Sequence, residues 1–371
     1  MALQLASHKL DEATCCFMTG SSNPELSREI LDKLGVPAKE TLQVKRFADG
    51  EIYVKIMDTV RGKDVYVIQS TSPPVNDNLM ELLLVVSTAR RASAKRITAI
   101  IPYYGYARQD RKVDSRTPIS AADVAKMIEA MGVDRVVSVD LHCGQIQGFF
   151  SPTVPMDNLE SHIVALDWMM PNIKFSSKVS VVSPDAGGVY RAKKFQEAMM
   201  SRGIPNPGLA MLIKHRSRPN QIEKMDLVGA VEGCDCLIID DIVDTAGTLC
   251  EAARQLRLNG ATRVVAFITH GLFSGPAVQR ITDSELETVV VTNSIVGLND
   301  EKVKACPKIQ SVSIGGLLAG AIHSIQYKQS ISALWGSKKA AKAPCGALPE
   351  KEAPACQAGS MPKAGSPMQE E

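Results

Sequence analysis

Three acids and several small or hydroxyl-bearing residues follow an apolar run in the stretch CLIIDDIVDTAGT, residues 236–248. The run CLIID is typical of a buried strand, and the pattern TLCEAARQLRLNG is typical of a helix closed by Gly260. The residues between them lie at a helix N-terminus, where free backbone N–H groups and the helix dipole attract an anion. Gly247 lets the backbone approach that anion closely, and Thr245 and Thr248 add hydroxyl donors.

The carboxylates of this stretch indicate that the ligand has a second part besides the anion. Carboxylates repel a phosphate, but they accept hydrogen bonds from the hydroxyl groups of a sugar. Asp244 or Thr245 taken alone is more simply explained as a helix cap, but capping does not explain three acids together. The stretch therefore predicts a sugar-phosphate site.

Two basic segments and one histidine are further candidates. YARQDRKVDSR follows the apolar run TAIIPYYG, and KHRSRPN has nothing apolar to anchor it, so we expect a mobile surface loop there. His142 follows the strand pattern VVSVDL. Basic runs are usually solvated faces and a lone histidine is more often structural, but ligands of parallel sheets bind at such strand ends.

Strand patterns alternate with helical patterns along the chain. NLMELLLVVSTARRA and AADVAKMIEAMG each place apolar residues on one helical face. This alternation predicts an α/β fold with parallel sheets covered by helices on both faces. The runs expected as buried strands are VYVIQS, RITAIIPYYG, RVVSVDLH, KVSVVSPD, CDCLIIDD, TRVVAFITHG and ETVVVTNS.

The length of 371 residues fits two such domains. The prolines of SPTVP mark the expected boundary, giving an N-terminal domain of residues 1–155 and a C-terminal domain of residues 156–335. The last helix of the second domain is a candidate to pack on the first. Residues 336–371 are rich in Ala, Pro, Gly, Lys and Ser, which predicts a disordered tail.

Composition excludes several classes of protein. A net charge of +2 gives no case for nucleic-acid or membrane binding, and the apolar runs are too short to span a bilayer. The nine cysteines have no zinc-site spacing, and the N-terminus does not resemble a secretory signal. We expect reduced thiols and a cytoplasmic location.

Seven blocks along the chain resemble those of one enzyme family, in that family's order. They are FADGE, IPYYGYARQDRK, DLHCGQIQGFF, VVSPDAGG, KHRSRPN, DDIVDTAGT and THGLFSGPA. DDIVDTAGT is similar to the ribose-phosphate loop of type I phosphoribosyltransferases, and the series is similar to the ribose-phosphate diphosphokinase, or phosphoribosyl pyrophosphate (PRPP) synthetase, family. The resemblance covers the chain from about Gly20 to Trp335 and implies two tandem, doubly wound phosphoribosyltransferase-like domains. A P-loop and a G-x-G-x-x-G turn are both missing from the sequence, so any ATP site is of another kind.

The resemblance implies a reaction and a set of residues for it. The diphosphoryl group of Mg-ATP moves to the 1-hydroxyl of ribose 5-phosphate, giving PRPP and AMP for nucleotide biosynthesis. It also implies Mg²⁺ as cofactor and a homo-oligomer, a hexamer in the family, in which FADGE reaches the ATP site of a neighbouring subunit. The implied residues are Lys214 and Arg216 for catalysis; Phe47, Asp49, Glu51, Arg108, Gln109 and His142 for ATP; Asp240, Asp241, Asp244, Thr245, Ala246, Gly247 and Thr248 for ribose 5-phosphate; and His142 and Asp185 for the metal.

Three alternatives stay open at this point. A phosphoribosyltransferase shares DDIVDTAGT but has no use for the FADGE and RQD blocks. A non-catalytic, PRPP synthetase-associated subunit lacks the catalytic loop and metal residues, which this chain keeps. A purely structural α/β protein leaves the acid cluster unexplained.

Overall fold

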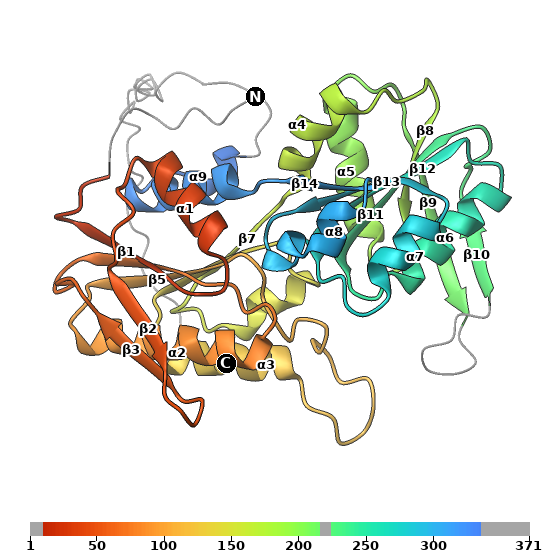
Figure 1. The fold of residues 1–371 in the computed structure, drawn as a ribbon. Coiled ribbons are helices and arrows are strands. Elements are labelled where there is room, and N and C mark those ends of the chain that lie inside the picture. Colours follow the sequence, from red (N-terminus) through yellow and green to blue (C-terminus); the bar gives the residue numbers. More distant parts are fainter. Residues whose placement is uncertain (1–9, 216–223, 335–371) are drawn as a thin grey trace, which may run out of the picture. The chain divides into compact units, whose positions relative to one another are not determined.

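The first sheet of the computed structural model is wholly parallel and has the strand order β1-β4-β5-β6-β7 (Figure 1). The structure describes residues 10–215 and 224–334. The elements of this part are β1 (Cys15–Thr19), α1 (Pro24–Leu34), β4 (Asp64–Ile68), α2 (Val75–Arg91), β5 (Arg96–Ile101), α3 (Ser120–Ala130), β6 (Arg135–Val139), η1 (Gly144–Phe149) and β7 (Met156–Leu159).

Side chains alternate between the two faces of this sheet, and each face is covered by helices. Along β4, Val65 and Val67 belong to an apolar cluster with residues of α2 and α3. Tyr66 and Ile68 belong to a second cluster with residues of α1 and of α9 (Gly315–Gln326). This is the period-two alternation of a strand buried on both sides.

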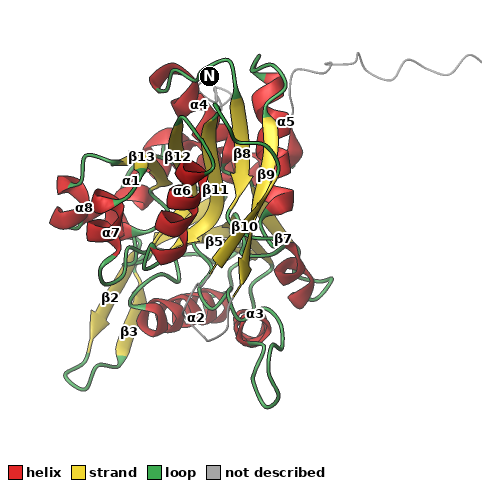
Figure 2. Ribbon diagram, turned by 90° about the vertical axis from the view of Figure 1, so that its right-hand side faces the viewer, coloured by secondary structure: helices red, strands yellow, loops and turns green. Residues whose placement is uncertain are grey.

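The second sheet has the order β10-β9-β8-β11-β12-β13-β14 and is parallel except at its β10 edge, which the sequence analysis did not predict. Figure 2 shows β8, β9 and β11 running side by side. Its strands are β8 (Val179–Ser183), β9 (Gly208–His215), β10 (Lys224–Val228), β11 (Asp235–Val243), β12 (Arg263–Gly271), β13 (Leu286–Thr292) and β14 (Ile309–Val312).

Helices cover both faces of this sheet too. Leu237 and Ile239 of β11 pack with residues of α4 and α5, while Cys236 and Ile238 pack with residues of α6, α7 and α8. The expected α/β class with doubly wound parallel sheets is therefore confirmed. The remaining elements are α4 (His162–Asn172), α5 (Val189–Ser201), α6 (Gly247–Leu258), α7 (Ala277–Asp283), η2 (Val296–Asn299), α8 (Glu301–Ala305) and η3 (Ile331–Leu334).

An antiparallel hairpin, β2 (Leu42–Arg46) and β3 (Ile52–Ile56), stands apart from both sheets and lies along α2 (Figure 1). Arg46 pairs with Ile52, so the block FADGE forms the loop at the tip. The sequence analysis did not predict these two strands. Residues of β3 alternate between partly buried and exposed, and β2 runs from a buried residue at its start to exposed residues at its end, so neither strand has the continuous apolar run of a fully buried strand.

Two details bear on the expected domain division. β7 pairs with β6, so the first sheet extends to Leu159, past the predicted boundary at residue 155. α9 follows the second sheet in the chain but shares an apolar cluster with α1 and β4. The division into two domains stays a prediction. Within the described residues, every helix is too short or too polar to cross a membrane.

Candidate active site

A cavity of about 1310 Å³ opens where the carboxyl ends of strands from both sheets meet. Its wall includes residues 140–144, which follow β6 in the chain, residues 185–188, which follow β8, and residues 240–249 at the end of β11. Arg108 and Asp110, from the loop that follows β5, also line the cavity. Ligands of open parallel sheets bind at this edge, because the loops and helix N-termini gather there.

The turn between β11 and α6 is the segment for which the sequence predicts an anion site, and it lines the cavity. Ala246, the N-cap residue of α6, has the left-handed backbone angles φ 60° and ψ 5°. Gly247 begins the helix, whose residues Leu249, Ala253 and Leu256 are buried. The first N–H groups of α6 therefore end at the cavity wall, where an anion can accept from them.

Asp244 connects this turn to the loop behind β5. Its Oδ2 accepts a hydrogen bond from Nη1 of Arg108 at 2.7 Å, which brings a predicted sugar residue and a predicted ATP residue together. Burial alone would raise the pKa of Asp244, but hydrogen bonds from Ser274 and Arg108 lower it below its ordinary value.

The two adjacent acids have different surroundings. Asp241 is 4% exposed, and its carboxylate contacts Nδ1 of His142 at 2.9 Å and Nη1 of Arg191 at 3.1 Å. Burial works against its charge, but Arg191 and His142 hold the pKa of Asp241 well below its usual range. Asp240 lies 3.4 Å from Nη1 of Arg191 and also accepts from the N–H of Asp241. Burial and the charge of Asp241 raise the pKa of Asp240.

His142 and Asp185 both line the cavity. The hydrogen bond with Asp241 raises the pKa of His142, although burial opposes this. Because Nδ1 is bonded to Asp241, Nε2 is the ring nitrogen that remains for a ligand. The Oδ1 atom of Asp185 accepts from the N–H of Gly188 at 3.1 Å, which holds the carboxylate at the start of α5. Within the described ranges no group of three or more His, Cys, Asp or Glu residues could hold a metal ion alone.

Four of the six predicted ATP residues do not line the cavity. Phe47, Asp49 and Glu51 occupy the exposed tip of the β2–β3 hairpin and are not among the residues that line the cavity. Phe47 is 54% exposed, and its ring meets that of Tyr53 edge-on at 5.8 Å. Gln109 accepts a hydrogen bond from Ser120 at 2.6 Å and so lies at the start of α3.

The predicted catalytic segment needs one correction. Lys214 and His215 are the last residues of β9 and pair with Met225 and Lys224 of β10, so they do not belong to a surface loop. The strand continues to His215 because β10 supplies a hydrogen-bonding partner for it. Ile213, which precedes Lys214, lines the cavity. Arg216 lies outside the described residues.

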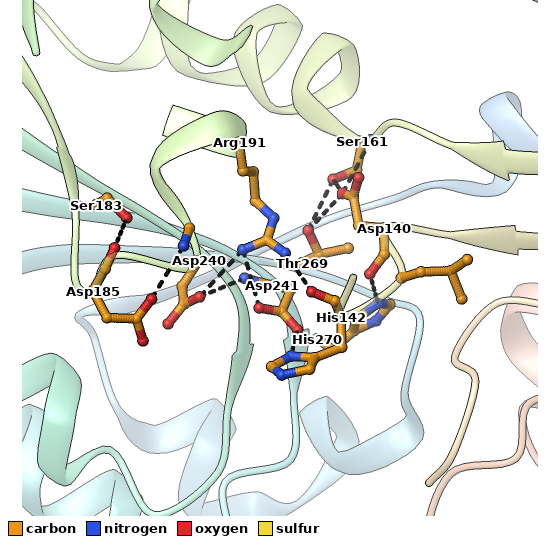
Figure 3. A network of polar contacts seen from close by, with 12 residues as sticks. Asp140, His142, Ser161, Ser183, Asp185, Arg191, Asp240, Asp241, Thr269 and His270 are labelled. Carbon is orange, nitrogen blue, oxygen red and sulfur yellow. Dashed lines mark hydrogen bonds and ion pairs between the residues drawn. The ribbon is translucent and has the colours of Figure 1, made fainter. Parts of the chain in front are cut away.

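Sequence reasoning missed Arg191 and a buried network beside it (Figure 3). Asp140, which has φ 38°, accepts hydrogen bonds from Thr269 at 2.7 Å and from the N–H of Ser161 at 3.2 Å. His270 contacts the carbonyl oxygen of Val139 at 3.0 Å, and burial lowers its pKa. Two of these residues could have been predicted from their positions in the sequence, because Asp140 and His270 both lie at the ends of predicted strands.

Known proteins resemble most of the chain. Residues 15–132 match the model of the N-terminal domain of ribose phosphate pyrophosphokinase, and residues 196–336 match that of the phosphoribosyl synthetase-associated domain. The ribose-phosphate pyrophosphokinase of Mesorhizobium japonicum is 49% identical over 319 residues, covering 86% of this chain and 99% of that protein. The one from Caulobacter vibrioides is 48% identical with the same coverage.

A solved structure agrees with these sequence relatives. The crystal structure of phosphoribosylpyrophosphate synthetase from Mycobacterium smegmatis superposes with a TM-score of 0.77 and 37% sequence identity. The match covers 85% of this chain and 99% of that one.

Proposed function

This chain belongs to the ribose-phosphate pyrophosphokinase family, and on that premise we propose that its cavity transfers the diphosphoryl group of Mg-ATP to the 1-hydroxyl of ribose 5-phosphate. The products are PRPP and AMP, which places the chain among the enzymes of nucleotide biosynthesis. One observation carries the proposal: Arg108 of the expected ATP site and Asp244 of the expected sugar site are 2.7 Å apart in one cavity.

The sugar phosphate is bound by the turn at the start of α6. Its phosphate accepts from the backbone N–H groups of Thr245–Thr248 and from the two threonine hydroxyls. Asp244 and Asp240 accept from the ribose hydroxyls, since both line the cavity. Asp241 was predicted to do the same, but its contacts with His142 and Arg191 favour a supporting role.

The donor chemistry of His142 and Asp185 fits Mg²⁺. That ion takes few protein ligands and fills its other positions with water and phosphate oxygens, so one imidazole and one carboxylate suffice. Bound Mg²⁺ would supply positive charge to the phosphate oxygens of ATP. His142 offers Nε2 for this purpose, because Asp241 holds Nδ1.

The remaining charge on the phosphates is neutralised by Arg108, Lys214 and Arg216. The 1-hydroxyl attacks the β-phosphorus in line, a step that depends on positioning and charge neutralisation rather than on a covalent intermediate.

The hairpin tip contributes to the ATP site of a neighbouring subunit. Phe47 stacks on adenine, while Asp49 and Glu51 accept from its amino group. The exposed position of Phe47, outside this chain's own cavity, supports a homo-oligomer, with a hexamer as the family's form. The described cysteines are all free thiols, which supports a cytoplasmic location.

An assay of adenine-nucleotide products tests this function. Purified protein with ATP, Mg²⁺ and ribose 5-phosphate should form AMP and PRPP in equal amounts, and omission of the sugar phosphate should abolish both. Stoichiometric ADP without AMP would identify a simple kinase instead. Failure to form any product would favour the non-catalytic associated subunit.

A further inference from the structure

Arg191 touches three parts of the candidate active site (Figure 3). It lies in the first turn of α5, and its guanidinium points toward the end of β11. Nη1 lies 3.1 Å from Oδ1 of Asp241 and 3.4 Å from Oδ1 of Asp240. Nη2 donates to the backbone carbonyl oxygen of His142 at 3.4 Å. The guanidinium thus connects a helix and two strand ends.

The charge of Arg191 has a specific role in this arrangement. Asp240 and Asp241 are neighbours in the chain, and the second is almost fully buried. Two adjacent carboxylates in such surroundings repel each other and lose hydration, which favours movement or protonation of one of them. One guanidinium that pairs with both acids offsets this repulsion.

His142 is fixed from two sides by the same group of residues. Its ring nitrogen Nδ1 is bonded to Asp241, while its backbone carbonyl accepts from Arg191. Asp241 is in turn bonded to Arg191. The direction of Nε2 therefore depends on Arg191 directly, through the backbone carbonyl of His142, and indirectly, through Asp241. Carboxylates behind a metal-binding histidine commonly fix the ring in this manner.

We propose that Arg191 is a positioning residue for the diphosphoryl transfer: it pairs with both acids and so holds Asp241 against His142, while Asp240 keeps its place at the sugar. The proposal rests on the proposed function, because it assigns Arg191 a part in that reaction. Each contact given above joins Arg191 to a protein group. A guanidinium can serve the two acids and the carbonyl at once, since its donors spread over a planar fork. A lysine ammonium lacks that geometry.

The kinetic test compares Arg191→Met and Arg191→Lys with a matched control. Arg202→Met removes the C-cap arginine of the same helix, which pairs with Asp167 outside the cavity and has a similar exposure. Arg191→Met should lower kcat about 10–100-fold, with the KM of either substrate changed less than about threefold. Arg191→Lys should recover part of kcat, and Arg202→Met should keep it. An unchanged kcat in Arg191→Met, or a loss mainly in the KM of one substrate, would overturn the proposal.

A second measurement does not depend on activity. Thermal unfolding of Arg191→Met, Asp241→Asn and the double variant forms a cycle. Arg191→Met should lower Tm, and adding Asp241→Asn should restore part of the loss because the uncompensated charge is gone. Additive effects on Tm would count against the proposal. If Arg191→Met does not fold, the double variant and Arg191→Lys provide the same two comparisons.

The kinetic and the unfolding experiments together distinguish a failure of the proposed role of Arg191 from a failure of the proposed function. Wild-type protein that forms neither PRPP nor AMP rejects the proposed function, while the unfolding cycle still shows whether Arg191 holds Asp241. Wild-type activity together with an uncoupled cycle and unchanged Arg191→Met kinetics rejects the role of Arg191 alone.

Discussion

The turn at residues 244–248 and the cluster around His142 share one cavity but are built in different ways. The turn, residues 244–248, is a single stretch of chain whose backbone faces the cavity. The His142 cluster, which we define as His142, Arg191, Asp240 and Asp241, joins the end of β6, the start of α5 and the end of β11.

This difference separates two kinds of dependence. The backbone of the turn lies in one segment at the N-terminus of α6, with Arg280 donating to the carbonyl oxygen of Thr245, so changes in that backbone should act mainly on the binding of one substrate. The cluster depends on the relative positions of three elements, the end of β6, the start of α5 and the end of β11. A change in any of its four residues should therefore act on kcat. The following predictions test that separation.

The largest effect is expected from His142→Ala. Because this change would remove a ligand of the proposed metal site, kcat should fall about 10²–10³-fold. Steady-state kinetics with both substrates checks this, with circular dichroism as a control for folding. If kcat is retained and only the KM for ribose 5-phosphate rises, the cluster and the turn do not differ in the way described.

A smaller effect is expected from Gly247→Ala. An added Cβ would meet Nη1 of Arg280 at 3.4 Å as its nearest neighbour, so the folded chain has room for it. The methyl group would instead stand where the phosphate approaches the backbone. The KM for ribose 5-phosphate should rise about tenfold, equivalent to roughly 1.4 kcal/mol, with kcat and the KM for ATP nearly unchanged. A melting temperature equal to that of the wild type is the control, and a loss of kcat instead would contradict the prediction.

The smallest effect concerns pH and distinguishes His142 from the buried His270. The hydrogen bond with Asp241 raises the pKa of His142 above 6.5, so its stabilising contribution is complete below pH 6.5 and is lost as the pH rises through the folded-state pKa. Burial lowers the pKa of His270, so its contribution is present above pH 6.5 and is lost as the pH falls.

Urea unfolding of the wild type, His142→Gln and His270→Gln between about pH 5.5 and 8.5 measures these contributions. The stability difference between the wild type and His142→Gln should shrink toward high pH, and that for His270→Gln should shrink toward low pH. Parallel pH profiles for all three proteins would show that neither histidine changes its pKa on folding.

The sequence predicts the turn better than the cluster for a physical reason. A strand pattern, a helix pattern and the residues between them fix the position of Gly247 without any knowledge of distant contacts. The contacts of Arg191 cannot be predicted from the local sequence in this way. It lies in a helical segment with Lys193 and Lys194, and nothing in that spacing indicates which basic residue meets Asp240 and Asp241.

The hairpin β2–β3 escaped prediction for a related reason. Its strands are as long as the predicted strands β4, β6 and β8, but polar side chains interrupt their apolar residues, as in QVKR and IYVKI. Phe47 was nevertheless singled out by resemblance, and the tip of the hairpin is where the structure places it. The partner proposed for Phe47 in a neighbouring subunit would depend on assembly, which a single chain's pattern does not specify.

The left-handed backbone of Ala246 has a consequence for how fast and how selectively the turn would bind the phosphate proposed for it. This conformation costs an L-residue about 1–2 kcal/mol, and here the packing of its methyl group in the core between β11 and α6 stabilises it. The cost is therefore met when the protein folds, and the amide groups are already aligned when a phosphate arrives. Association loses little backbone entropy, so capture resembles docking onto a rigid template, and an anion with the wrong spacing cannot reshape that template to fit.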